Sequence, residues 1–176
     1  MKKVLSLILV VLVAFAISAT KKTAKNAASK GNLWITGTAS VQSFSGDLDY
    51  TSLSLAGSGV YFVINHLGVG GVLYYNSISD GVDSTDLGLS GKVIWAFDNF
   101  ADKNFYPYAG ACLGLGSISN GESESGLVLW IGGGMNYLLG KHIGILAELG
   151  YYSASLGDID YGGFILQAGL IGVFKP

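Results

Sequence analysis

The side chains that could act as a nucleophile or a base are few in this chain and lie far apart in its sequence. The two histidines, His66 and His142, fall in predicted turns, and the single cysteine, Cys112, lies on a predicted strand with no histidine nearby. Nucleophilic catalysis needs a base within hydrogen-bond reach of the nucleophile. Neither a glycine-rich phosphate loop nor a basic nucleic-acid patch is evident. We therefore expect no enzyme, no catalytic residue, no cofactor and no nucleic-acid partner.

The acidic residues gather in four predicted turns that contain no lysine and no arginine. Clustered carboxylates could hold Ca²⁺ or Mg²⁺, because these cations prefer oxygen ligands. Aspartate is also a common turn residue, and even the densest group, residues 80–86, does not match a calcium-binding loop. We predict an acidic rim without a dedicated metal site, and leave open a divalent cation or a surface protein as its ligand. The rim consists of Asp47, Asp49, Asp80, Asp83, Asp86, Glu122, Glu124, Asp158 and Asp160.

Lys92 and Glu148 are the charges predicted in strand interiors, away from the strand ends, and both fall on the face that carries small and polar residues. An unpaired buried charge is costly, so we predict a Lys92–Glu148 ion pair, direct or through Gln167, Asn136 or a water molecule. A pair that fills the interior accounts for both residues without a proton or ion relay.

The elements that position these side chains follow from a sequence period of two, which places alternate residues on opposite faces of a strand. Leu53, Leu55, Tyr61 and Val63 alternate with serines and small residues, and the same pattern recurs along the chain. The predicted strands cover residues 32–45, 52–64, 67–77, 85–97, 105–118, 125–138, 143–153 and 162–174. Turns of about 5–9 residues are expected at the acidic end.

The apolar face of these strands is the one expected to touch lipid. The chain has 176 residues, of which 50% are hydrophobic and only 12% are charged, with no apolar run after residue 19 long enough for a spanning helix. The leucine-bearing face carries no charge, and its aromatic residues fall at the two strand ends, as membrane interfaces favour. We predict an all-β fold, an eight-stranded antiparallel up-and-down transmembrane β-barrel. The alternative is a soluble periplasmic barrel that binds an apolar ligand.

Three segments are predicted along the chain. Residues 1–19 have the basic start, apolar middle and small residues of a cleaved signal peptide. Residues 20–31 are polar and rich in lysine and alanine, which predicts a flexible periplasmic lead-in, with a short helix as the alternative. Residues 32–174 form the barrel.

The inward face is predicted to fill the lumen, because eight strands enclose room only for side chains. Bulky apolar side chains gather toward one end, whereas serine, asparagine, glutamine and glycine gather toward the acidic end. The predicted apolar plug contains Trp34, Val60, Phe62, Val72, Ile94, Tyr106, Tyr108, Leu138, Leu146, Ile171 and Val173.

Several segments resemble the small eight-stranded outer-membrane barrels of the opacity-protein, Ail-like and OmpX-like group. Residues 105–116 (FYPYAGACLGLG) are similar to their fifth strand, and residues 132–137 and 147–152 to their sixth and seventh. The resemblance implies a protein of the Gram-negative outer membrane and cell surface, with outer-membrane lipid and the assembly machinery as partners. The implied assembly signal in the last strand comprises Phe164, Leu166, Leu170 and Phe174.

The resemblance implies a non-enzymatic barrel with a structural or surface-interaction role, and we expect a monomer. The alternative is a small porin-like pore or a lipid-binding barrel, which would need an open lumen.

Overall fold

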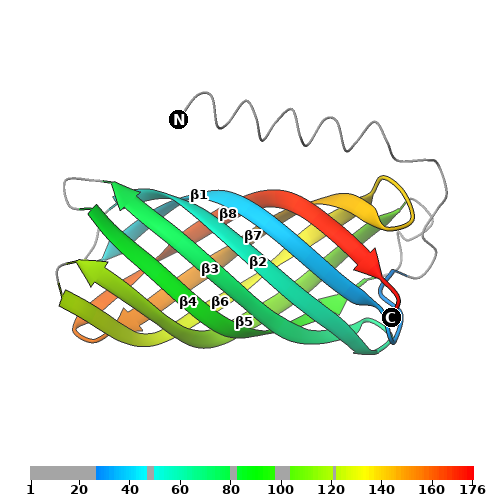
Figure 1. Ribbon diagram of the computed structural model, residues 1–176, viewed down its shortest axis with the longest axis horizontal. Helices are drawn as coiled ribbons and strands as arrows, with labels where there is room; N and C mark the ends of the chain where they lie inside the picture. Colours follow the sequence, from blue (N-terminus) through cyan, green and yellow to red (C-terminus); the bar gives the residue numbers. More distant parts are fainter. Residues whose placement is uncertain (1–26, 47–49, 80–82, 98–103, 121) are drawn as a thin grey trace.

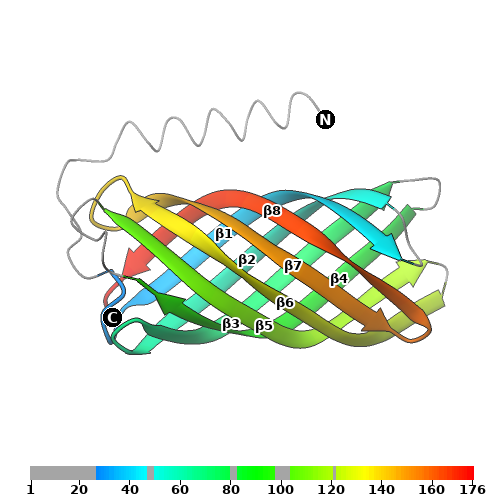
Figure 2. The same cartoon turned by 180° about the vertical axis from the view of Figure 1, so that it is seen from behind.

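The chain folds as one closed barrel of eight antiparallel strands, which confirms the predicted fold class (Figure 1). The computed structural model describes residues 27–46, 50–79, 83–97, 104–120 and 122–176. Each strand pairs with its neighbour in the sequence, and β8 closes the barrel by pairing with β1. The strands are β1 (Leu33–Gly46), β2 (Tyr50–Ile64), β3 (Leu67–Ser79), β4 (Asp83–Ala96), β5 (Phe105–Asn120), β6 (Glu122–Leu138), β7 (Ile143–Leu156) and β8 (Ile159–Phe174). Figure 2 shows from behind that the wall is continuous and that its strands are strongly tilted.

The two ends of the barrel differ. Leu33 pairs with Phe174, so β1 begins where β8 finishes, and we call this the N/C end. The opposite end, which carries the Gly157–Asp158 turn between β7 and β8, is called the rim. Among the described residues, no helix has the length and apolar character needed to cross a membrane.

The leucine-bearing face points outward. In β7 the exposed and buried residues alternate along the whole strand, as a period of two requires. Leu53, Leu113 and Ile145 are well exposed on the outer surface, whereas Lys92 and Glu148 are buried inside. Exposed aromatic residues lie toward both ends of the strands: Tyr61, Trp95, Phe97, Tyr137 and Phe174 toward the N/C end, and Tyr75, Tyr151 and Phe164 toward the rim.

The strands extend farther toward the rim than the sequence predicted. β8 begins at Ile159 rather than at residue 162, and β7 runs to Leu156, so two residues suffice for the turn. Gly157 supplies the positive φ of 60° that such a turn needs. The expectation of connections of about 5–9 residues was therefore wrong here, because polar residues past the apolar band still pair as strand.

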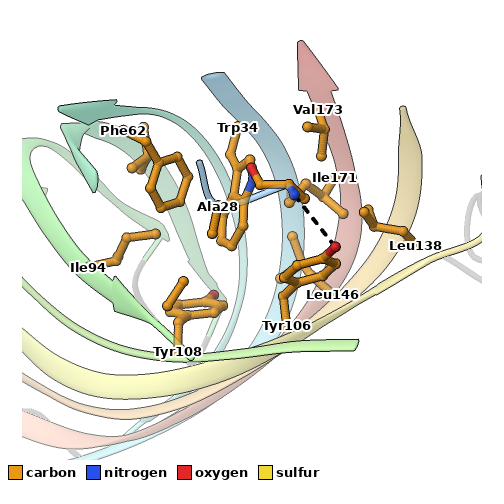
Figure 3. Close-up of a cluster of buried hydrophobic side chains, with 13 residues drawn as sticks. Ala28, Trp34, Phe62, Ile94, Tyr106, Tyr108, Leu138, Leu146, Ile171 and Val173 are labelled. Atoms are coloured by element: carbon orange, nitrogen blue, oxygen red, sulfur yellow. Dashed lines mark hydrogen bonds between the residues drawn. The ribbon is translucent and has the colours of Figure 1, made fainter. Parts of the chain in front are cut away.

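Residues 27–31 are packed rather than forming part of a flexible lead-in. Ala27 and Ala28 are buried in the barrel mouth at the N/C end (Figure 3). The Ala27 carbonyl accepts hydrogen bonds from Trp34 Nε1 at 2.9 Å and Asn32 Nδ2 at 3.0 Å. The amide of His66 donates to the Ala28 carbonyl at 2.9 Å. The predicted signal peptide and residues 20–26 lie outside the described residues.

Two apolar clusters fill the lumen. The cluster at the N/C end contains every predicted plug residue except Val72, and adds Ala27, Ala28 and Ala96 (Figure 3). A second cluster, nearer the rim, comprises Cys112, Ile118, Val128, Trp130, Tyr152, Ala154, Leu156, Tyr161 and Ile165. The expectation that small and polar residues fill the rim half was therefore incomplete, because β5 to β8 continue their inward alternation with bulky side chains.

Candidate functional site

Lys92 and Glu148 meet across the lumen between the two apolar clusters. Lys92 projects inward from β4 and Glu148 from β7, and these strands are not neighbours in the wall. Lys92 Nζ lies 2.6 Å from Glu148 Oε1, and their side chains are only 7% and 4% exposed. The contact is direct, so the two charges compensate each other away from the outer surface of the barrel.

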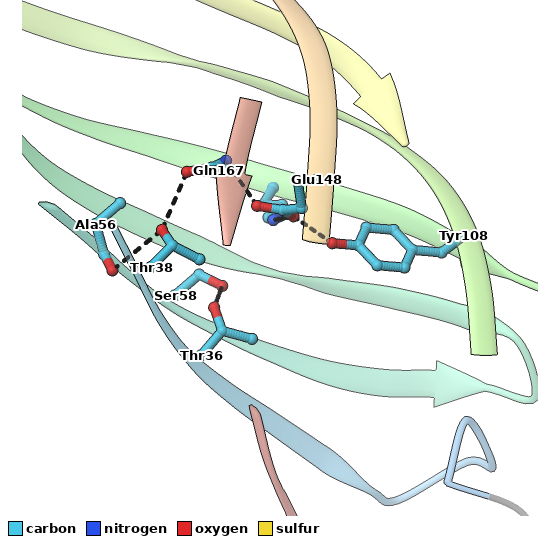
Figure 4. A network of polar contacts seen from close by, with 8 residues as sticks. Thr36, Thr38, Ala56, Ser58, Tyr108, Glu148 and Gln167 are labelled. Atoms are coloured by element: carbon cyan, nitrogen blue, oxygen red, sulfur yellow. Dashed lines mark hydrogen bonds and ion pairs between the residues drawn. The ribbon is translucent and has the colours of Figure 1, made fainter. Parts of the chain in front are cut away.

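Glu148 is held by two further donors (Figure 4). Its Oε1 accepts a hydrogen bond from the Tyr108 hydroxyl, and its Oε2 accepts one from Gln167 Nε2 at 2.6 Å. Gln167 Oε1 in turn accepts a hydrogen bond from Thr38 Oγ1 at 3.0 Å. Of the two predicted mediators, Gln167 therefore joins the network. Asn136 does not, and its buried amide has no hydrogen-bond partner among the described residues.

Lys92 also packs against aromatic rings. Its Nζ lies 5.4 Å from the centroid of the Trp130 ring and 5.9 Å from that of Tyr108. Both distances are within the range of a cation–π attraction. The ammonium group is thus fixed by a carboxylate on one side and by ring faces on others.

Asp86 is a lumen residue and not a rim residue. It is 0% exposed, and its Oδ2 accepts hydrogen bonds from Asn76 Nδ2 at 2.9 Å and the Tyr161 hydroxyl at 3.0 Å. The prediction failed because Asp86 was grouped with the acidic turn at residues 80–86, although it also lies inside the predicted strand over residues 85–97, and β4 begins even earlier, at Asp83. Residue 86 is an even number of positions from Ser90 and Lys92, whose side chains point inward. The alternation along the strand could therefore have placed the Asp86 side chain in the lumen.

The other predicted rim residues lie at or near the rim as far as they are described. Asp158 and Asp160 are exposed and Glu124 is half-buried, while Asp83 and Glu122 are the first residues of β4 and β6. Asp47, Asp49 and Asp80 lie outside the described residues. Among the described residues, no group of three or more histidine, cysteine, aspartate or glutamate side chains could hold a metal ion.

The histidines and the cysteine are separated in space. His66 and His142 lie in turns at the N/C end, where His142 Nδ1 is 2.9 Å from the Val173 carbonyl. Cys112 is buried in the lumen. The proposed assembly residues all lie on β8, and Phe164, Leu166 and Phe174 are exposed on its outer face, with Leu170 half-buried.

A cavity of about 60 Å³ lies in the lumen around the ion pair. β1, β2 and β4 contribute hydroxyl groups to its wall, whereas β5 to β8 contribute mainly aromatic and apolar side chains together with Glu148 and Gln167. Its lining includes Thr36, Thr38, Ser54, Ser58, Ser90, Asn76, Lys92, Glu148, Gln167, Cys112, Trp130, Tyr74 and Tyr152.

The fold is shared with solved outer-membrane proteins. The neisserial surface protein A (NspA) matches with a TM-score of 0.72 and 19% identity, over 82% of this chain and all (100%) of that one. The N-terminal barrel domain of Pseudomonas aeruginosa OprF matches with a TM-score of 0.55 and 18% identity, over 82% of this chain and 98% of that one. The attachment invasion locus protein Ail of Yersinia pestis matches with a TM-score of 0.51 and 17% identity, over 82% and 99%.

No protein-family model matches the chain, and no curated protein matches its sequence. The structural likeness alone therefore assigns the architecture. The chain has the fold of the small eight-stranded outer-membrane β-barrels.

Proposed function

We propose that this protein is a non-enzymatic barrel of the bacterial outer membrane, with a closed lumen and a structural or surface-interaction role. The observation that carries the proposal is the outward face, which is apolar between two sets of aromatic residues. A charge on such a face at mid-bilayer costs about 2–4 kcal/mol. The likeness to NspA and to Ail, the attachment invasion locus protein, supports the same location.

Cell fractionation and heat-modified gel mobility test the membrane assignment. The full chain is expected in the outer-membrane fraction, with a folded form that migrates differently from the boiled form. Recovery of folded protein in the soluble periplasmic fraction without detergent would contradict the proposal.

A closed lumen is supported by the cluster at the N/C end. Phe62, Tyr106, Leu138 and Ile171 are at most 1% exposed and pack together in one cluster across that end. The alternative function, a small porin-like pore, needs a continuous path. Recordings in planar bilayers are expected to show no stable conductance steps, and reproducible steps from the purified folded protein would favour the pore.

Contact with partners is proposed for the rim, where acidic side chains are gathered. An acidic surface attracts basic partners through a field that salt screens. Binding of a fluorescent oligolysine peptide to the folded protein is expected to weaken as salt rises, and to weaken further in the Asp158→Asn/Asp160→Asn variant. The matched control is Lys141→Gln, which removes an exposed charge at the other end.

A further inference from the structure

The cavity beside the ion pair is large enough to hold solvent. A buried water molecule needs about 10–15 Å³ of such space together with several polar partners, and the cavity offers about 60 Å³. Hydroxyl groups of Thr36, Ser58 and Ser90 line it, next to Lys92 and Glu148. The lumen therefore contains a chamber with polar groups on part of its wall, and not a continuous apolar core.

The chamber is closed toward the N/C end by apolar packing. The side chains between the ion pair and that mouth include Trp34, Phe62 and Ile94, whose rings and aliphatic groups are buried. The turn at residues 27–31 covers this layer from the outside. Water crosses such packing poorly because it finds no hydrogen-bond partner there.

Toward the rim the chamber is closed by the second apolar cluster, which includes Ile118 and Leu156, and by a group of polar side chains beside it. Asn76 lines the chamber, and Asn76 and Tyr161 both donate to Asp86 Oδ2. Asp86 on β4 and Tyr161 on β8 each lie within four residues of the rim end of their strand, and they reach each other across the lumen. We call these three residues the rim constriction.

The Asp86 carboxylate indicates which solutes can pass this constriction. Its second carboxylate oxygen, Oδ1, accepts no hydrogen bond of good geometry among the described residues, although the residue is 0% exposed and the Tyr74 hydroxyl is a further neighbour of the carboxylate. A carboxylate oxygen in that position favours water and cationic groups and disfavours anions.

We propose that the chamber is a hydrated site that takes water and small cationic solutes, and that these enter from the rim through the constriction of Asn76, Asp86 and Tyr161. The N/C end takes no part in this exchange. The site is a blind inlet, which is compatible with a barrel that does not conduct.

Cys112 provides the test, because it is the single cysteine of the chain and lines the chamber. Alkyl methanethiosulfonates modify a thiolate by forming a mixed disulfide on Sγ, with methanesulfinate as the leaving group. Two reagents of similar size would be compared on the folded protein in detergent micelles, one with an ethylammonium group and one with an ethylsulfonate group. Modification would be followed by mass spectrometry.

Two matched substitutions distinguish the two ends. Tyr161→Phe removes a hydroxyl from the constriction, and Tyr106→Phe removes a hydroxyl from the N/C mouth, where it lies 3.5 Å from the Ala27 amide nitrogen. Tyr161→Phe is expected to speed modification of Cys112 about fivefold, since one hydrogen bond of the closure is lost. Tyr106→Phe is expected to leave the rate unchanged.

Charge selection is tested with Asp86→Asn. The ethylammonium reagent is expected to react about tenfold faster than the ethylsulfonate reagent in the unchanged protein, and Asp86→Asn should abolish that preference. The proposal would be overturned by equal acceleration in both tyrosine variants, by a larger effect of Tyr106→Phe, or by a preference that survives Asp86→Asn. Failure of the folded protein and of Tyr161→Phe to react, while the denatured chain reacts, would overturn it as well.

Discussion

Trp34 Nε1 donates a hydrogen bond to the Ala27 carbonyl at 2.9 Å, and this contact ties the segment before β1 to the inside of the barrel mouth. The indole also packs edge-on against Phe62 at 4.7 Å between ring centroids. One side chain thus serves both the apolar plug and the turn that covers it.

The Trp34→Phe substitution should release residues 27–31 while the barrel stays folded. A smaller aromatic ring remains in the plug, and besides some packing the Ala27 carbonyl loses a donor, at a cost of about 1 kcal/mol for the hydrogen bond. Limited trypsin digestion followed by mass spectrometry is expected to show faster cleavage after Lys30, which is already exposed. Trp95→Phe, a change on the outer surface, is the control, and equal cleavage in both variants would contradict the assignment.

Removal of one partner of the lumen ion pair should be more harmful than removal of both. Lys92→Met leaves the Glu148 carboxylate without its cation in a buried site, and such a change destabilises by about 3–5 kcal/mol. The double variant Lys92→Met/Glu148→Gln leaves no buried charge at this position, so much of the loss should be recovered.

Urea unfolding in detergent, followed by heat-modified mobility, measures this difference. Glu148→Gln alone completes the double-mutant cycle, because it leaves Lys92 unpaired. Additive effects of the two single changes would show that the 2.6 Å contact contributes no coupling.

The sequence predicted best the direction of side chains, which depends only on the alternation of residues along a strand. In β4, Leu87, Leu89 and Val93 point outward and Lys92 points inward, as a period of two requires. Direct contact of Lys92 with Glu148 was among the expected outcomes, because an eight-stranded barrel is narrow enough for inward side chains to meet.

What could not be predicted depends on where a strand stops and on contacts between distant segments. The rim ends of β7 and β8 were misplaced because alternation continues past the lipid-facing band, so polar residues give no sign of the strand end. Asp86 was grouped with the rim although it lies inside the predicted strand over residues 85–97. The burial of Ala27 depends on Trp34 and Tyr106, the latter 79 positions away. The composition of residues 20–31, which is rich in lysine and alanine, does not indicate that contact.

Several glycines make room for inward aromatic rings, and Gly150 is the clearest case. A Cβ at this position would collide with the indole of Trp130 from the adjacent strand β6, and would come within 2.8 Å of the Ile131 carbonyl oxygen. Gly150→Ala is therefore expected to destabilise the folded barrel by about 1–3 kcal/mol, as overpacking does. Gly59→Ala is the control, because a Cβ there would meet nothing within 4 Å. Equal unfolding midpoints of the two variants in urea would contradict the inference that Gly150 makes room for the Trp130 ring.

Substitutions on the outward face test most directly whether lipid or water surrounds the barrel. Leu113 on β5 is 62% exposed, and its register partner on β6 is Leu129, so an arginine at position 113 would face lipid near the middle of the wall. Leu113→Arg is expected to lower the free energy of unfolding in lipid vesicles by about 2–4 kcal/mol. Ser123→Arg, at another exposed position, near the rim, should cost at most about 1 kcal/mol, because a charge near the interface remains hydrated. If both substitutions had the same small effect, the leucine-bearing surface would face water, and the membrane assignment would have to be abandoned.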